Sequence, residues 1–283
     1  MDLKELVRQT QKSWSDEFFI SGTTTDVSGI CYDSRNVTNG ELFCCLRGRQ
    51  FDGHNYAANA IKDGATALLV DRQLDLAVPQ VLVRDTRRAM ALLAASFFGH
   101  PSEHLKIAGV TGTNGKTSVV SILAHLLRMS DWMVAESGTL TGVRTTPEAP
   151  ELQLKLSNWL SSDVEAVCME VSSHALAQHR IDGTKFELVA YTNLTRDHLD
   201  YHESMFEYGE AKQRLFTREF SNRAVIVIDD VGGRIRAKRA SREGLDVVEV
   251  STIDAIPEFD SSGSAFTWRG ERLYLPLPGS FAL

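Results

Sequence analysis

The residues best suited to chemistry lie in one glycine-rich segment, Gly109-Val-Thr-Gly-Thr-Asn-Gly-Lys-Thr-Ser118. An apolar run at 105–110 leads into it, and apolar residues at helical spacing follow over 117–129. A strand, a glycine loop, Lys-Thr and a helix together bind nucleotide phosphates, because backbone N–H groups and the positive helix end face the anion. Lys116 adds a mobile charge, and the Thr117 hydroxyl can ligate Mg²⁺. The segment therefore predicts a phosphate-binding site.

Carboxylates follow two candidate strands and could complete that site. Glu170 comes directly after the apolar run 164–169, and Asp229 comes directly after an equally apolar run at 224–228. A carboxylate beside a phosphate loop commonly holds Mg²⁺, directly or through water. The strand pattern alone does not choose between these two acids.

A third candidate is the His- and Asp-rich segment 193–202, which follows the predicted strand 187–192. Its density of polar side chains at a strand end is typical of a metal or phosphate site. Histidines that only form hydrogen bonds at the surface would leave the same pattern. Both interpretations stay open at this point.

Lys212 is a fourth candidate, on the predicted helix 203–219. It shares a helix face with Tyr208 and Leu215, so its stem lies on the apolar side. One interpretation is a snorkelling lysine, with the ammonium in water, and the spacing favours it. The other is a buried amine that loses its proton and reacts.

The elements that must position these residues alternate between strand and helix. Alternation of this kind predicts right-handed crossovers, a mostly parallel α/β sheet, and ligands at the carboxyl ends of the strands. We expect a first domain at 1–100, a turn-rich linker at 99–102, and a second domain at 104–283. The predicted strands are 41–46, 65–70, 80–83, 105–110, 164–169, 187–192, 224–228 and 247–250, with a hairpin turning at 269–271. The predicted helices are 56–62, 87–98, 117–129, 151–161 and 203–219.

Composition restricts the class of protein. The 283 residues are 43% hydrophobic and 24% charged, which is ordinary for a globular protein, and the net charge of −7 argues against nucleic-acid binding. The basic run 234–239 is interpreted as a solvated helix face, because no aromatic residues interleave with it. Four cysteines without a C-x-x-C pair predict buried free thiols in a reducing compartment. With no secretory signal and no apolar run of membrane-spanning length, we expect a cytoplasmic protein without membrane insertion.

Six motifs follow one another along the chain. They are Asp33-Ser-Arg35, Gly48-Arg-Gln-Phe-Asp-Gly53, Thr111-Gly-Thr-Asn-Gly-Lys-Thr117, Thr145-Thr-Pro-Glu148, Met169-Glu-Val-Ser-Ser-His-Ala-Leu176 and Asn193-Leu-Thr-Arg-Asp-His-Leu-Asp-Tyr-His202. In the glycine segment the spacing is G-x-x-G-x-x-G-K-T, with Val110 where the standard loop has its first Gly. This series resembles the motifs of the Mur ligases of peptidoglycan synthesis, and within that family the type that adds the third amino acid to UDP-N-acetylmuramoyl-L-alanyl-D-glutamate.

The resemblance implies roles that spacing leaves open. It implies that Glu170 and His198 hold Mg²⁺ with Thr117, and it sets Asp229 aside. It implies that Lys212 is carbamylated, carrying a CO₂-derived carboxylate near the metal, and that Lys116 is catalytic. The ATP-binding residues would be Gly112, Thr113, Asn114, Gly115, Lys116, Thr117 and Ser118. The residues that bind the UDP-dipeptide would be Tyr32, Ser34, Arg49, Gln50, Phe51, Thr145, Thr146, Ser172, Gln178 and Arg180.

The implied activity is carboxylate activation by a monomeric ligase. ATP transfers its γ-phosphoryl group to the D-glutamyl carboxylate, and the amino group of a diamino acid attacks the acyl phosphate to give an amide. The incoming amino acid would be meso-diaminopimelate or lysine. Arg144 stands where some members of the family have Asn.

The chain differs from the family pattern at its end. Gly279-Ser-Phe281 is followed by Ala282 and Leu283, where the family continues with Asn and then a third domain. We expect that C-terminal ligase domain to be absent from this chain. One hypothesis is a piece of a three-domain ligase with little turnover alone, and another is a naturally short, non-catalytic binding module. A folylpolyglutamate synthase-like ligase is a weaker alternative, because Asp33-Ser-Arg35 argues against it.

Overall fold

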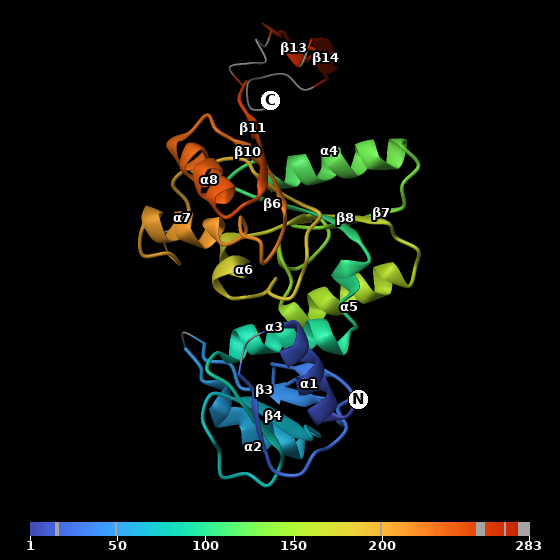
Figure 1. Cartoon of the computed structure of the whole chain (residues 1–283), viewed down its shortest axis with the longest axis vertical. Coiled ribbons are helices and arrows are strands. Elements are labelled where there is room, and N and C mark those ends of the chain that lie inside the picture. Colours follow the sequence, from blue (N-terminus) through green and yellow to red (C-terminus); the bar gives the residue numbers. More distant parts are fainter. Residues whose placement is uncertain (15–16, 49, 199, 253–257, 269, 277–283) are drawn as a thin grey trace.

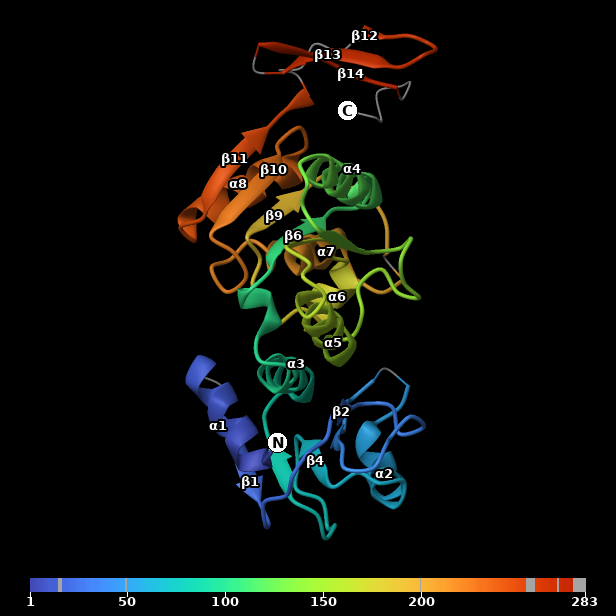
Figure 2. The ribbon, with the colours of Figure 1, turned by 90° about the vertical axis from the view of Figure 1, so that its right-hand side faces the viewer.

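The computed structural model describes residues 1–14, 17–48, 50–198, 200–252, 258–268 and 270–276, without the side chain of Phe259. It is an α/β protein in which three sheets follow one another along the long axis of the molecule (Figures 1 and 2). The N-terminal sheet lies at one end, the central sheet in the middle, and a small antiparallel sheet at the other end.

The N-terminal sheet has five strands in the order β1-β5-β4-β3-β2, all parallel except β1. Helices α1 and α3 pack on one face with Leu6 and Leu93, and α2 packs on the other with Ala60. Since both faces are covered, the inner strands β3 and β4 are continuous, buried apolar runs. The strands are β1 (Phe19–Ser21), β2 (Ile30–Cys31), β3 (Leu42–Cys44), β4 (Ala67–Val70) and β5 (Gln80–Leu82). The helices are α1 (Leu3–Ser13), η1 (Gly53–Tyr56), α2 (Ala57–Lys62) and α3 (Thr86–Phe97).

The central sheet has six parallel strands in the order β11-β10-β9-β6-β8-β7. Helix α4 packs on one face with Val120 and Ala124, and α5 packs on the other with Leu152 and Leu156. The strands are β6 (Lys106–Thr111), β7 (Val134–Ser137), β8 (Ala166–Glu170), β9 (Leu188–Tyr191), β10 (Arg223–Val227) and β11 (Asp246–Val250). The helices are η2 (Pro101–Glu103), α4 (Lys116–Met129), α5 (Ala149–Leu160), α6 (Ser173–Ala177), α7 (Met205–Gln213) and α8 (Val231–Arg242).

The third sheet has the order β12-β13-β14 and is antiparallel. Its strands are β12 (Glu258–Phe259), β13 (Ser264–Trp268) and β14 (Glu271–Leu275). The predicted hairpin is confirmed, because Trp268 pairs with Glu271 and Gly270 has φ 87°. Arg269, named in that prediction, lies outside the described residues.

The mostly parallel α/β sheet predicted from the sequence is confirmed, and the predicted strands coincide with β3–β6 and β8–β11 within a few residues. The pattern missed helices α1 and α6, strand β7 and the short strands β1, β2 and β12. The predicted helix 203–219 was too long, since α7 ends at Gln213 and turns follow to Phe220. All four cysteines are free and buried. Among the described residues, no helix is long and apolar enough to cross a membrane.

Gly109 in β6 offers a test of the central packing. A Cβ on Gly109 would lie 2.6 Å from Cε1 of Phe186, a core residue that is 5% exposed. We predict that Gly109→Ala lowers the free energy of unfolding in urea by about 1–3 kcal/mol, because the ring has to move. In a Phe186→Leu background, Gly109→Ala should lower the free energy of unfolding by less. A double-mutant cycle measures this coupling between the two positions. A single variant within about 0.5 kcal/mol of wild type would contradict this packing.

Candidate functional site

The topology of the central sheet brings three loops to one edge. Strand β6 ends at the glycine loop and lies between β8 and β9. Val110 pairs with Glu170 in β8, and Thr111 pairs with Tyr191 in β9. Because all these strands are parallel, their carboxyl ends meet at the edge where ligands bind in α/β sheets. The sequence candidates in the glycine loop, at Glu170 and in the segment 193–202 therefore lie on neighbouring loops.

The glycine loop has the backbone shape that a phosphate site requires. Gly112 has φ 153°, and a Cβ there would lie 1.9 Å from Oγ1 of Thr192. Gly115 has φ 83° and begins α4 without any side-chain cap. The first N–H groups of a helix have no partner within the helix, so an uncapped start favours an anion. Thr117 is half-buried and Ser118 is exposed in that first turn.

The segment 193–195 fastens to the glycine loop through several hydrogen bonds. The backbone N–H of Asn114 donates to Oδ1 of Asn193 at 3.0 Å, and that of Thr195 donates to Oγ1 of Thr113 at 3.0 Å. Oγ1 of Thr113 also lies 3.1 Å from the Tyr208 hydroxyl of α7. These contacts fix the loop after β9, and the helix behind it, against the phosphate loop.

Two amines converge on one carbonyl of the loop. Nζ of Lys212 donates to the Gly112 carbonyl at 2.8 Å, and Nζ of Lys116 donates to the same oxygen at 3.0 Å and to the Thr113 carbonyl at 2.8 Å. Lys212 is 1% exposed, so the snorkelling interpretation was wrong. Its neighbour Tyr208 has its ring centroid 4.4 Å from Nζ. A helical face does not reveal that another loop covers it.

Burial sets the charge of these amines. Desolvation, together with the charges of Lys116 and Arg236, lowers the pKa of Lys212 to about 6. Desolvation also lowers the pKa of Lys116, while Glu170 and Asp197 oppose that change. Lys212 is therefore largely an uncharged amine at neutral pH.

Arg236 is a residue that sequence reasoning missed. The run 234–239 was interpreted as a solvated face, and at Arg236 that is wrong, because the side chain is 4% exposed. It donates to the carbonyls of Gly209 and Gly232 at 2.7 and 2.9 Å and lies over the Tyr191 ring. The sequence of a basic run does not indicate which of its side chains is buried.

The structure separates the two candidate acids. Glu170 is 1% exposed, lies on the strand beside β6, and accepts a hydrogen bond from the Thr139 N–H at 2.8 Å. Gly138 leaves it room, since a Cβ there would be 2.3 Å from Oε1. Asp229 follows β10, which β9 separates from β6, and accepts hydrogen bonds from Ser251 and Thr252. Of these two acids, Glu170 is therefore the one beside the phosphate loop.

His198 lies on the loop after β9 in a left-handed conformation with φ 52°. Its ring is 43% exposed and packs edge-on against His174, with centroids 4.8 Å apart. Burial, together with His198 and His202, lowers the pKa of His174 to about 4. The part of the chain that the structure describes contains no group of three or more His, Cys, Asp or Glu side chains arranged to hold a metal ion. The predicted metal ligands thus lie on adjacent loops without forming a closed cage.

The residues expected to bind the dipeptide form two groups. Oγ1 of Thr146 donates to the Glu170 carbonyl at 2.9 Å and accepts from the Ser172 N–H at 3.1 Å. Arg180 donates to Oε1 of Gln178 at 2.6 Å and lies 3.0 Å from the Glu148 carboxylate. Thr145 lies 3.1 Å from Thr139 through their hydroxyls. This first group therefore surrounds the end of β8.

The second group lines a cavity of about 470 Å³ between the N-terminal and central sheets. Of the expected residues, Tyr32, Ser34 and Phe51 line it, Gln50 is exposed and does not, and Arg49 lies outside the described residues. Two lining arginines, Arg87 and Arg144, were not among the expected residues. Arg87 is the second residue of an ordinary apolar helix, which gave no signal of its role.

The pH dependence of stability tests the buried amine. In the unfolded chain a lysine titrates near its ordinary pKa of about 10.4, and in the folded chain Lys212 titrates at about 6. Between these values the unfolded state binds the extra proton, so stability rises with pH. We predict that the free energy of unfolding of wild type, relative to Lys212→Met, rises by about 1 kcal/mol per pH unit between about pH 6 and 9 in CO₂-free buffer. Parallel pH profiles would contradict the burial of this amine.

Comparison with known proteins places this geometry in a family. The model of the Mur ligase middle domain matches residues 110–282, and that of the Mur ligase family catalytic domain matches residues 26–98. The UDP-N-acetylmuramoyl-L-alanyl-D-glutamate–2,6-diaminopimelate ligase of Listeria innocua is 36% identical, over 100% of this chain and 60% of its own length. The ligase of that name from Clostridioides difficile is also 36% identical, over 91% of this chain and 57% of its own.

Solved structures of ligases have the same fold as this chain. A structure of a ligase with the same name superposes with a TM-score of 0.79 at 28% identity, covering 90% of this chain and 57% of that chain. A folylpolyglutamate synthase complex with AMPPCP reaches a TM-score of 0.53 at 16% identity over 69% of this chain, which shows a shared fold alone. The chain thus spans a little over half the length of these ligases. Since both family models match and together cover most of its length, this chain belongs to the Mur ligase family.

Proposed function

We propose that this chain provides the ATP and UDP-dipeptide sites of a ligase that adds a diamino acid to UDP-N-acetylmuramoyl-L-alanyl-D-glutamate. The observation that carries the proposal is the buried Lys212 amine, bonded to the Gly112 carbonyl under a nucleotide-type loop. An ordinary phosphate loop needs only the lysine that Lys116 supplies. A second, uncharged amine at the same oxygen fits a site in which a lysine becomes a carbamate.

The loop and its neighbours fit ATP and Mg²⁺. In this proposal the N–H groups of 115–118 face the phosphates, and Lys116 leaves its carbonyl partners to pair with them. Thr117, Glu170 and His198 would hold Mg²⁺, which prefers oxygen ligands and keeps several waters. Thr117, Glu170 and His198 do not enclose a metal ion by themselves, so water and phosphate oxygens would supply the remaining ligands. The metal would neutralise charge on the phosphates.

Lys212 has the properties that carbamylation requires. Its neutral amine would add to CO₂, forming an N–C bond and releasing one proton. The carboxylate produced would stand beside two cations, the half-buried Lys116 and the buried Arg236, which favour a negative charge. We propose that this carboxylate faces the metal site.

The two groups of substrate residues fit the two ends of the UDP-dipeptide. The uridine diphosphate would occupy the cavity lined by Tyr32, Ser34 and Phe51, where Arg87 and Arg144 supply positive charge. The D-glutamyl carboxylate would reach Arg180, beside Thr146 and Ser172 at the end of β8. There it stands close to the phosphate loop, as in-line phosphoryl transfer requires.

The mechanism needs positioning more than covalent help from the protein. The γ-phosphoryl group passes to the D-glutamyl carboxylate, and Lys116 balances the charge that builds on the transferred oxygens. The amine of the incoming diamino acid then displaces phosphate and forms the amide. The names of the relatives point to 2,6-diaminopimelate as that amino acid.

We further propose a division into domains at 1–100 and 104–283, and a monomer that works in the cytoplasm. Because the chain spans about half the length of its relatives, we propose that turnover by this chain alone is negligible. The alternative is a binding module without catalysis. It would have the same ATP and UDP-dipeptide sites, and it would differ from a ligase only in lacking turnover. A folylpolyglutamate synthase-like activity is disfavoured, because that fold match covers less of the chain.

Nucleotide affinity tests the loop. We predict that wild type binds AMPPCP with Mg²⁺ and that Lys116→Ala weakens the binding at least about tenfold, the size expected for a lost charge-assisted hydrogen bond. Isothermal titration calorimetry measures both affinities. Lys155→Ala on α5, whose amine lies 5.9 Å from the Trp159 ring, is the matched control and should bind as wild type does. Equal affinities for Lys116→Ala and the control would refute the ATP site.

A further inference from the structure

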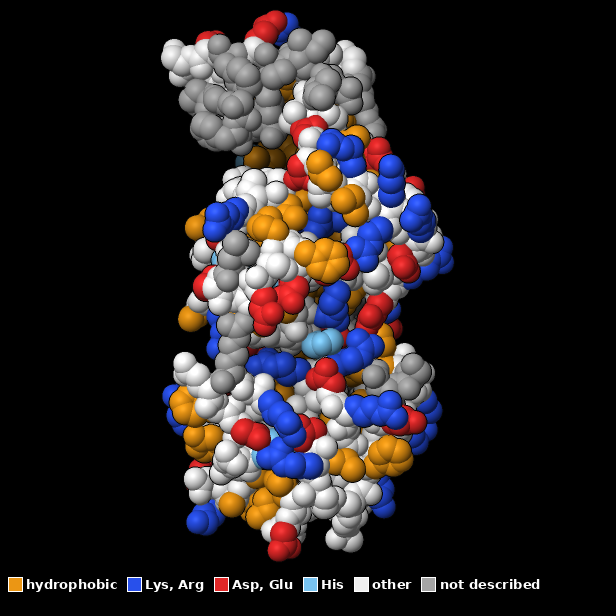
Figure 3. All heavy atoms as spheres, turned by 90° about the vertical axis from the view of Figure 1, so that its left-hand side faces the viewer, with side chains coloured by type: hydrophobic (Ala, Val, Ile, Leu, Met, Phe, Trp, Pro, Cys, Tyr) orange, Lys and Arg blue, Asp and Glu red, His pale blue; other side chains and the backbone are white. Residues whose placement is uncertain are grey.

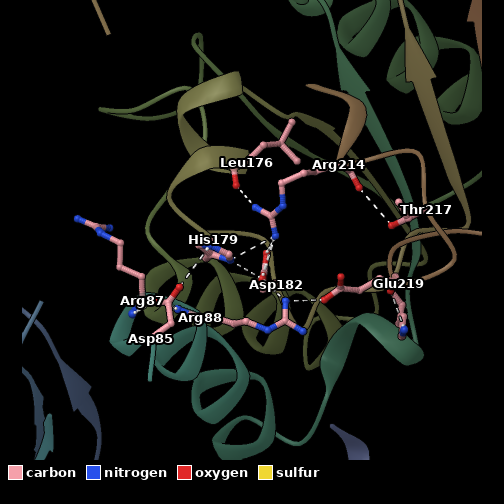
Figure 4. Close-up of polar contacts among 10 residues, drawn as sticks. Asp85, Arg87, Arg88, Leu176, His179, Asp182, Arg214, Thr217 and Glu219 are labelled. Carbon is pink, nitrogen blue, oxygen red and sulfur yellow. Dashed lines mark hydrogen bonds and ion pairs between the residues drawn. The ribbon is translucent and has the colours of Figure 1, made fainter. Parts of the chain in front are cut away.

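A buried carboxylate joins the N-terminal and central sheets at a point outside both substrate sites. The Asp182 side chain is fully buried. Its oxygens accept hydrogen bonds from Nη1 of Arg88 at 2.8 Å and from Nη2 of Arg214 at 3.1 and 3.2 Å, and they lie 2.7 Å from Nδ1 of His179 (Figure 4). Two cations and an imidazole thus converge on one acid.

These partners come from three separate elements. Arg88 lies on α3, the last helix of the N-terminal sheet, and also bonds Glu219 at 2.8 Å. His179 lies in the turn after α6, with a left-handed φ of 57°. Arg214 caps the end of α7 and donates to the Leu176 carbonyl. Figure 3 shows Lys, Arg, Asp and Glu side chains gathered around the junction of the two sheets.

The backbone beside Asp182 packs directly on α3. Gly183 has φ 81°, and a Cβ there would lie 2.8 Å from Cβ of Ala95 and 3.3 Å from the Ala91 carbonyl. Next to it, Nε2 of Gln153 donates to Oγ1 of Thr184 at 2.9 Å in a buried bond. The close contact leaves α3 little freedom to shift while the Asp182 bonds hold.

Each element tied to Asp182 also carries a residue of the proposed sites. Arg87, beside Arg88, lines the cavity for the uridine diphosphate, and in Figure 4 its side chain points away from Asp182. Arg180 follows His179 and belongs to the dipeptide group, and Lys212 lies two residues before Arg214, in the last turn of α7. A shift of any one element would displace one of these three side chains.

We propose that Asp182 is a positioning residue that locks α3 to the turn after α6 and to the end of α7, and so aligns Arg87, Arg180 and Lys212. The inference rests on the proposed function for its substrate readout. Although burial opposes ionisation, the hydrogen bond from His179 and the charges of Arg214 and Arg88 lower the pKa of Asp182. The acid is therefore charged at neutral pH. Asp182→Asn keeps its size and removes that charge, leaving two arginines without their shared anion.

The first measurement is hydrogen exchange without any substrate. In Asp182→Asn we expect amides of α3 and α7 to exchange about tenfold faster, relative to the β6 and β8 amides of the same protein. Glu187→Gln is the matched acid-to-amide control, because its ion pairs with Arg223 and Lys106 are exposed. Faster exchange in the Asp182 variant alone supports the proposal, and the same pattern in both variants overturns it.

The second measurement is the affinity for UDP-N-acetylmuramoyl-L-alanyl-D-glutamate. We expect Asp182→Asn and Arg88→Met each to weaken it about tenfold, and the double variant to lose little more, because both break the same tie. Wild-type affinity in Asp182→Asn, or fully additive losses, would overturn the proposal. If wild type itself does not bind this compound, the proposed function fails, and the exchange measurement alone decides the role of Asp182.

Discussion

The carbonyl oxygen of Gly112 holds the candidate site together. It accepts from Lys116 within the loop and from Lys212 of α7, whose amine is buried beneath. Both glycines that shape the loop lie against Thr192, at the end of β9. The loop is therefore fixed from the strand before it, the strand beside it and the helix behind it. Such preorganisation lets a phosphate replace internal partners without reshaping the backbone.

The sequence predicted the part of this arrangement that local spacing encodes. A strand, a glycine loop and an apolar helix are contiguous, so the phosphate site and the parallel sheet could be inferred from one segment. The choice between Glu170 and Asp229 could not, because it depends on strand order. Only the order β10-β9-β6-β8 shows that Glu170 lies next to the loop and Asp229 does not.

Several residues that sequence reasoning misplaced or missed lie at contacts between distant segments. Lys212 and Arg236 carry charges that are normally solvated, and each is buried only because another element covers it. Arg87 and Arg144 line the cavity between the sheets, yet they lie 57 positions apart in the sequence. Helical periodicity shows which residues share one face of a helix. It does not show which other helix or loop packs on that face, and the burial of these side chains depends on that packing. The family motifs, in contrast, assign Lys212 to the site, and its Nζ bonds the Gly112 carbonyl there, while its carbamylation stays a prediction.

The most direct test of the account is the affinity of the whole chain for UDP-N-acetylmuramoyl-L-alanyl-D-glutamate, measured by calorimetry. The account predicts binding by wild type, and loss of binding when Ser34→Ala and Arg180→Ala are combined, since these residues lie at the two ends of the proposed substrate site. Arg84→Ala, whose side chain is 92% exposed, serves as the control that should bind normally. Unchanged affinity in the double variant would contradict the assignment of this chain as the substrate-binding part of a Mur ligase.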